Sequence, residues 1–174
     1  MIRSRVARSI GLFALFAFSA VVAEADDLPD PQKTPGDAFP VTKDQICQAR
    51  YTACVRHVSN PSKIYKSYGI KSHKPKEYEI DHLISLELGG SNDEKNLWPQ
   101  SYITEPRNAH VKDFLENKLN ELVCSNQISL KDAQHAISTN WIDAFDRYGG
   151  RATPPKHSKR ISEAECRDLH DKLW

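Results

Sequence analysis

The sequence predicts an α+β domain in which a short hairpin is followed by a helix. Residues 78–82 (Tyr-Glu-Ile-Asp-His) alternate apolar and polar side chains, which is typical of a short strand. Residues 89–93 (Gly-Gly-Ser-Asn-Asp) are a strong turn signal. Residues 109–123 repeat apolar side chains at helical spacing. These segments therefore predict one strand–loop–strand–helix unit with further helices around it.

The N-terminal segment has the pattern of a secretory signal peptide. Arg3, Arg5 and Arg8 precede an apolar run at 10–23, which ends at small residues up to Ala25. The run is too short to cross a bilayer comfortably, which disfavours the alternative of a membrane anchor. We expect residues 1–25 to be removed and the mature chain to be periplasmic or secreted, without a membrane attachment.

Turn-forming residues and capping signals divide the mature chain. Residues 26–40 contain four prolines and one glycine, and we expect a flexible lead-in there. The folded domain is predicted at 41–148, and residues 149–174 are expected to form a linker and a short helix. Within the domain, the stretch 46–58 is ambiguous between helix and extended chain.

Two longer helices are predicted after the hairpin. The second strand resumes at Asn96 and stops at Pro99. Asn108 occupies the N-cap position of a helix over 109–123. A second helix is predicted over 130–141. The apolar face expected for the first helix consists of Val111, Phe114, Leu115, Leu119 and Leu122.

The charge balance argues against a protein that coats nucleic acid. The whole chain carries +1, and residues 1–25 hold three arginines and one glutamate, a charge of +2. The mature chain is therefore about −1, since +1 minus +2 leaves −1. Any attraction to phosphate must be local or supplied by a bound cation.

The cysteines favour disulfides. An even number in an exported chain suggests two bridges, and the spacing lacks the close Cys-x-x-Cys pair of a zinc cluster. Four cysteines allow three pairings. If residues 46–58 were one helix, the first two cysteines would be about 10 Å apart along its axis, too far to bond. The four are Cys47, Cys54, Cys124 and Cys166.

His82 and Asp81 have the chemistry that phosphodiester hydrolysis requires. Histidine can take a proton from water near neutral pH, and a divalent cation can stabilise charge on the phosphate. Oxygen ligands such as the Asp81 carboxylate favour magnesium or manganese. Because neighbouring strand residues point to opposite faces, the two side chains either need a local kink to serve one site or serve different sides of it.

The ordered motifs of the chain resemble the HNH endonucleases, the ββα-metal nucleases, and within them a group of small exported bacterial proteins. The resemblance covers roughly residues 45–142. It is carried by Asp81-His82, Glu87-Leu-Gly-Gly90, Asn96-Leu-Trp-Pro99 and Asn108-Ala-x-x-Lys112-Asp113, with fourteen positions from His82 to Asn96. It implies a ββα-metal core with flanking helices, stapled by disulfides.

The resemblance also implies roles for these residues. His82 is similar to the general base that activates water, and Asp81 to the acidic ligand of one divalent cation, magnesium or manganese. Asn96 resembles the asparagine that holds the loop and orients the histidine. Asn108 is the favoured third ligand and His110 is its competitor.

Two further expectations follow from the resemblance. Cys47 and Cys124 lie where the group tends to carry cysteine, which implies a Cys47–Cys124 bridge and leaves Cys54 for Cys166. Nucleic acid, DNA rather than RNA, is the expected partner. Separately, the basic run at 71–76 is either a solvated loop or a set of cations that position phosphates without reading sequence. The candidates are Lys71, Lys74, Lys76 and Lys112.

The sequence therefore predicts an exported, metal-dependent endonuclease of low sequence specificity. One alternative is a non-catalytic exported module that keeps the fold for binding or structure; Ser85 stands where relatives often carry proline, which leaves room for it. A second alternative is a secreted nuclease toxin, which would be accompanied by an immunity protein.

Overall fold

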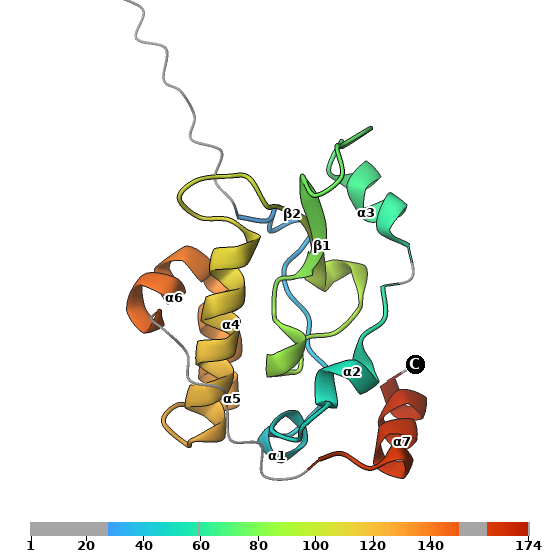
Figure 1. Cartoon of the computed structure of the whole chain (residues 1–174), viewed down its shortest axis with the longest axis vertical. Helices are drawn as coiled ribbons and strands as arrows, with labels where there is room; N and C mark the ends of the chain where they lie inside the picture. Colours follow the sequence, from blue (N-terminus) through green and yellow to red (C-terminus); the bar gives the residue numbers. More distant parts are fainter. Residues whose placement is uncertain (1–27, 59, 150–159, 174) are drawn as a thin grey trace, which may run out of the picture.

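The computed structural model describes residues 28–58, 60–149 and 160–173, and its centre is a two-stranded hairpin followed by a long helix (Figure 1). Strands β1 (Tyr78–His82) and β2 (Leu97–Ser101) pair antiparallel, with Tyr78 opposite Ser101 and His82 opposite Leu97. The predicted α+β class and the order strand, strand, helix are confirmed. The predicted signal peptide at 1–25 lies outside the described residues.

Helices surround this hairpin. Figure 1 shows α4, α5 and α6 on one side of it, α3 beside the start of β1, and α7 near α2. Their bounds are α1 Lys43–Ile46, α2 Tyr51–Val55, α3 Pro61–Ser67, α4 Ala109–Cys124, α5 Leu130–Thr139, α6 Trp141–Tyr148 and α7 Glu163–Leu173.

The stretch 46–58, which was ambiguous in the sequence, contains the end of one short helix, α1, and all of a second, α2. Thr42 and Gln45 form a reciprocal capping box that begins α1. Arg50 then adopts a positive φ of 72°, which ends any continuous helix between Cys47 and Cys54. The two cysteines therefore lie on separate elements and can bond to different partners.

The prediction of a flexible lead-in at 26–40 is wrong for its described part, residues 28–40. The Thr34 hydroxyl donates to the Leu97 carbonyl at 3.0 Å, and Thr34 is 1% exposed. The Gly36 and Phe39 amides donate to the carbonyls of Lys95 and Gly89. Prolines exclude helix here, but they leave an extended chain free to bond along the hairpin loop.

Helix α4 begins and ends as predicted, but its buried face differs from the prediction. The Asn108 side chain accepts the Val111 amide, so the predicted N-cap forms. Phe114 was placed on the buried face, yet it is 57% exposed. Lys112 is buried instead, because acidic side chains from two elements surround its ammonium group.

The second predicted helix is divided at Asn140. Its side chain accepts the amides of Ile142 and Asp143, which begins α6 directly after α5. Trp141, predicted as the end of one helix, is therefore the first residue of the next and is fully buried.

Both predicted disulfides are present. Cys47 bonds to Cys124 and joins the end of α1 to α4, while Cys54 bonds to Cys166 and joins α2 to α7. Disulfides persist in oxidising compartments, which fits the expectation of export. Among the described residues, none of the helices has the length and apolar composition needed to span a membrane.

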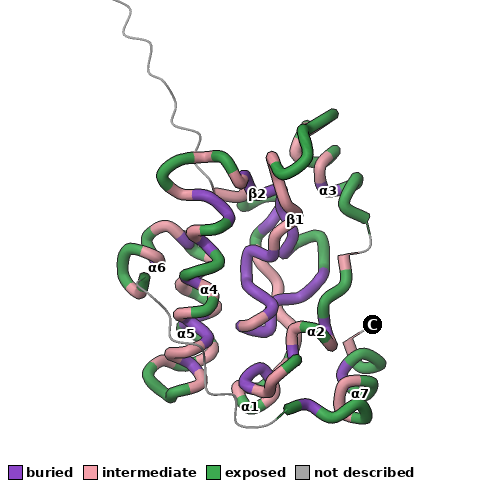
Figure 2. Tube along the Cα trace, in the orientation of Figure 1, coloured by how far each residue is buried: buried purple, intermediate pink, exposed green. Residues whose placement is uncertain are grey.

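The connection between β1 and β2, residues 83–96, is here called the site loop. It contains two 3-10 helices, Leu86–Leu88 and Glu94–Asn96, and is mostly buried at the centre of the molecule (Figure 2). A Cβ atom added at Gly90 would lie 1.7 Å from the Ile84 carbonyl oxygen. Two parts of the site loop thus approach so closely that only glycine fits.

Candidate active site

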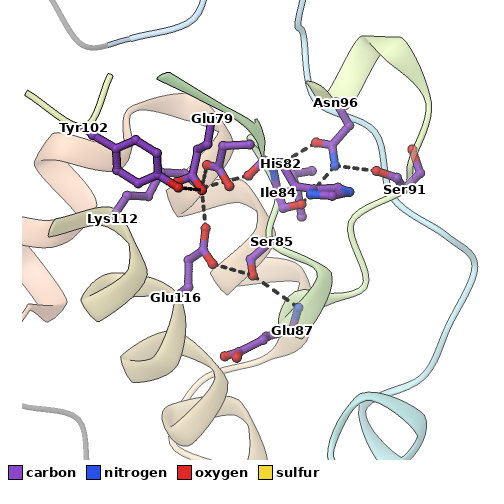
Figure 3. A network of polar contacts seen from close by, with 11 residues as sticks. Glu79, His82, Ile84, Ser85, Glu87, Ser91, Asn96, Tyr102, Lys112 and Glu116 are labelled. Carbon is purple, nitrogen blue, oxygen red and sulfur yellow. Dashed lines mark hydrogen bonds and ion pairs between the residues drawn. The ribbon is translucent and has the colours of Figure 1, made fainter. Parts of the chain in front are cut away.

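Asn96 holds the site loop in shape. This side chain is fully buried, and its Nδ2 donates to the carbonyls of Ile84 and Ser91, each at 2.9 Å. Its Oδ1 accepts the Ile84 amide at 2.8 Å and the Asp37 amide at 3.4 Å. Figure 3 shows Asn96 bridging the two arms of the loop. The predicted role of Asn96 in holding the loop has this structural basis.

His82 ends β1 and is 3% exposed. Its Nε2 lies 3.0 Å from Oδ1 of Asn92. Burial lowers the pKa of His82; the hydrogen bond to Asn92 and the charge of Asp81 oppose this, and the cations of Arg56 and Lys112 reinforce it. The imidazole is therefore neutral near pH 7 and can accept a proton.

The Asp81 side chain does not share the partner of His82. Its Oδ2 accepts a hydrogen bond from Nζ of Lys112 at 2.6 Å, while the His82 ring bonds Asn92. The same Nζ donates to the backbone carbonyl of His82 at 2.7 Å. The alternation of the strand is thus kept, without a kink that turns both side chains to one side. In Figure 3 the His82 ring lies toward Asn96, and Lys112 lies on the other side.

The Lys112 ammonium group occupies an oxygen cage. Glu116 completes it, through its Oε1 on Nζ of Lys112 and its Oε2 on the Ser85 hydroxyl at 2.9 Å. Burial opposes the charge on Lys112, but Asp81 and Glu116 outweigh it and raise the pKa of Lys112. Burial raises the pKa of Glu116. The cage ties β1, the site loop and α4 together.

Further carboxylates lie around Asp81. Glu79 accepts a hydrogen bond from the Tyr102 hydroxyl. Burial raises the pKa of Glu79 and of Asp113, and the negative charge of Asp81 raises both further. Negative charge on the exposed side of Asp81 is therefore incompletely compensated by Lys112.

The two candidates for the third metal ligand differ in what they contact. Asn108 uses its Oδ1 to accept the Val111 amide at 3.2 Å, as an N-cap does. His110 is exposed, and its ring lies 4.9 Å from that of Tyr102. Its charge also acts on Asp113. The N-cap bond favours His110 over Asn108 as a ligand, because one oxygen does not easily serve both purposes.

The donor set near Asp81 suits a hard divalent cation in its chemistry. The Asp81 side chain is 15% exposed, and a cation beside it would relieve the repulsion felt by Glu79 and Asp113. The described residues contain no cluster of three or more histidine, cysteine or acidic side chains already arranged as a metal site. A bound cation would thus need ligands of other types or a local adjustment.

The predicted phosphate-binding lysines separate into two groups. Lys71, Lys74 and Lys76 are exposed in the segment that leads into β1. Lys112 has no exposed surface and is occupied by the oxygen cage, so it is not available to nucleic acid. The sequence did not reveal this burial, because a lysine is rarely buried without acidic partners and its partner Asp81 lies on another element.

Several residues of the site were not identified from the sequence. Arg56 is exposed and acts electrostatically on both His82 and Asp113. Asn92 was included only in a turn signal, although it contacts the His82 ring. Glu116 follows Lys112 by four residues, and this spacing was a missed signal for an ion pair within a helix.

A surface hollow lies away from these residues. It has a volume of about 940 Å³ and is lined by the connection between α4 and α5 (residues 126–129), by α5 and α6, and by Lys43. None of His82, Asp81 and Asn96 lines it. The hollow is therefore separate from the candidate active site.

Comparison with known proteins returns no relative for this arrangement. The chain matches no family model, no curated protein and no solved structure. The fold and site described above are therefore the basis for assigning a function.

Proposed function

We propose that this chain is an exported HNH-type endonuclease that hydrolyses phosphodiester bonds, preferentially in DNA, with low sequence specificity. The observation that carries the proposal is the buried imidazole of His82, bonded to Asn92 at the start of a loop that Asn96 holds through three hydrogen bonds to Ile84 and Ser91. A general base must be unprotonated and held in place, and both conditions are met.

His82 is the proposed general base. It takes a proton from a water molecule, and the resulting hydroxide attacks phosphorus. The bond between phosphorus and the 3′ oxygen breaks, and this oxygen leaves and takes up a proton from solvent. Because burial lowers the pKa of His82, the ring is ready to accept this proton at neutral pH. The charge of Asp81 favours the imidazolium that forms, which eases the transfer.

Asp81 is the proposed ligand for one divalent cation, together with His110 or Asn108 at the start of α4. Since the Asp81 and His82 side chains point to opposite faces of β1, the proposal requires them to act from different sides of the phosphate. When bound, magnesium or manganese supplies Lewis-acid stabilisation of the phosphate and of the leaving oxygen. Lys112 holds the opposite oxygen of the Asp81 carboxylate and restricts its rotation.

Exposed cations would hold the nucleic acid. We propose that Arg56, which acts electrostatically on His82, contacts a phosphate next to it. The exposed residues Lys71, Lys74 and Lys76, which precede β1, are proposed to contact the backbone further along the nucleic acid. Such contacts bind phosphate and carry no sequence information. Low sequence specificity follows from this arrangement.

One observation favours a second candidate function, a non-catalytic exported module on the same fold. The Asp81 carboxylate is bonded to a buried ammonium group, and His82 is 3% exposed. Both groups could serve stability alone. The two candidates differ in whether the mature chain cleaves nucleic acid.

Plasmid nicking by the mature chain tests the proposal. We expect cleavage with Mg²⁺ or Mn²⁺, its loss with chelator, and a fall of about 10²–10⁴-fold in His82→Ala, which lacks the base. His135→Ala is the matched control, because His135 is exposed on α5 and is not among the site residues. Absence of nicking with either ion, or nicking that survives His82→Ala, contradicts the proposal.

A further inference from the structure

The orientation of the Asn92 side-chain amide is determined by the backbone around it. Its Nδ2 donates to the Val55 carbonyl at 2.7 Å, and its Oδ1 accepts the His57 amide at 3.0 Å. A carbonyl only accepts and an amide N–H only donates, so the reverse orientation would place like groups against each other twice. The oxygen of Asn92 is therefore the atom that faces His82.

An amide oxygen facing the imidazole determines which ring nitrogen carries the proton. Nε2 of His82 is 3.0 Å from Oδ1 of Asn92, and Oδ1 can only accept. We infer that Asn92 is a positioning residue, which holds neutral His82 in the tautomer with hydrogen on Nε2 and leaves the lone pair on Nδ1. The tautomer follows from the contacts alone; its importance for catalysis rests on the proposed function.

This contact serves both states of the proposed base. When Nδ1 takes a proton, Nε2 keeps its hydrogen, so the bond to Asn92 is preserved and the ring does not need to turn. Asn92 is 8% exposed, which keeps water from competing for Nε2. The partner that orients the base is thus a neutral amide, which raises the pKa of the imidazole far less than a carboxylate would.

Asn92 also connects His82 to the end of α2. The two backbone groups that it bonds, on Val55 and His57, flank Arg56. One side chain therefore orients the imidazole and fixes the backbone that carries Arg56, an exposed cation that acts on the His82 ring. The charged groups that act on the His82 ring are Asp81, Arg56 and Lys112.

The tautomer is measurable in the mature wild-type chain, without any variant that might fail to fold. Long-range ¹H–¹⁵N NMR of the histidine rings at pH 7.5, with His82 assigned by its absence in His82→Gln, distinguishes the protonated nitrogen. We expect a single species with hydrogen on Nε2. A ring with hydrogen on Nδ1, or a mixture of both tautomers, overturns the inference.

Asn92→Asp tests the positioning role. The carboxylate still accepts from Nε2 but cannot donate to the Val55 carbonyl. We therefore expect neutral His82 in Asn92→Asp to keep hydrogen on Nε2 in the same NMR experiment. Asn126→Asp is the control, since this exposed residue adds the same charge beside Lys43. A neutral His82 ring with hydrogen on Nδ1 in Asn92→Asp overturns the inference.

Asn92→Ala separates positioning from binding. Loss of the acceptor frees the ring, so kcat should fall at least tenfold while KM changes less than twofold. A wild-type chain that shows the Nε2–H tautomer but does not nick DNA contradicts the proposed function and leaves the tautomer assignment standing. A chain that nicks DNA with the other tautomer overturns only the role of Asn92.

Discussion

Replacing Lys112 with methionine removes the only cation of the oxygen cage. Asp81 and Glu116 then face each other with side chains that are 15% and 14% exposed, and the His82 carbonyl loses a donor. Removing one partner of a buried ion pair costs about 3–5 kcal/mol, because the remaining charge stays unpaired. We expect Lys112→Met to lower the free energy of unfolding by this amount.

Urea unfolding at pH 7 measures the effect. With a slope of about 2 kcal/mol per molar urea, the midpoint should fall by about 1.5–2.5 M. Lys118→Met on the same helix is the control. Its ion pair with Glu121 is partly exposed, at 23% and 20%, and should contribute less than about 1 kcal/mol.

A double variant refines the test. Lys112→Met with Glu116→Gln removes one charge of each sign and should recover part of the loss, since fewer unpaired charges remain buried. If Lys112→Met lowers the free energy of unfolding no more than Lys118→Met does, the ammonium group does not compensate buried carboxylates and the description of the cage is incorrect.

Four further outcomes are expected. Burial lowers the pKa of His82 in the folded chain, so the stability that this residue contributes is complete above its unfolded pKa of about 6.5 and is lost as pH falls below that value. His82→Gln should therefore flatten the acid side of a stability profile measured by urea unfolding at several pH values. Asn96→Ala leaves three buried backbone groups of Ile84 and Ser91 unpaired and should cost about 3 kcal/mol or more in the same assay. Replacing Cys54 and Cys166 with serine removes a disulfide between residues 112 positions apart, and loop closure predicts a loss of up to about 5 kcal/mol in the free energy of unfolding. Hydrogen exchange should speed up first in α7, and uniform protection would argue against this. Asp81→Asn should weaken Mn²⁺ binding at least tenfold in a titration followed by electron paramagnetic resonance, and equal affinity would remove Asp81 as a ligand.

Local signals made much of the fold predictable. The alternation at 78–82 and the cap at Asn108 each act within a few residues, and β1 and α4 formed as expected. Asn60 followed by Pro61 was an equally local signal for the start of α3, through an N-cap and a proline at the first helical position, and it was missed. The division at Asn140 was missed because an N-cap inside a helical pattern appears as one more polar residue.

Contacts between distant residues were not predictable in the same way. Lys112 is buried because Asp81 lies 31 positions earlier in the chain, and helical periodicity contains no information about that partner. Asn92 orients His82 only because the end of α2 supplies a carbonyl and an amide around it. The identity of the predicted base came from a motif, whereas its surroundings required the tertiary fold.

The close approach at Gly90 has a consequence for the evolution of this chain. A side chain at this position would meet the Ile84 carbonyl and, at 2.9 Å, the Nδ2 of Asn96, so even alanine would displace the two arms of the site loop. No compensating change in a neighbouring side chain relieves a collision with backbone. Position 90 should therefore accept only glycine in a saturation library selected for folding. Neutral substitutions in this protein should accumulate at other positions while Gly90 stays unchanged.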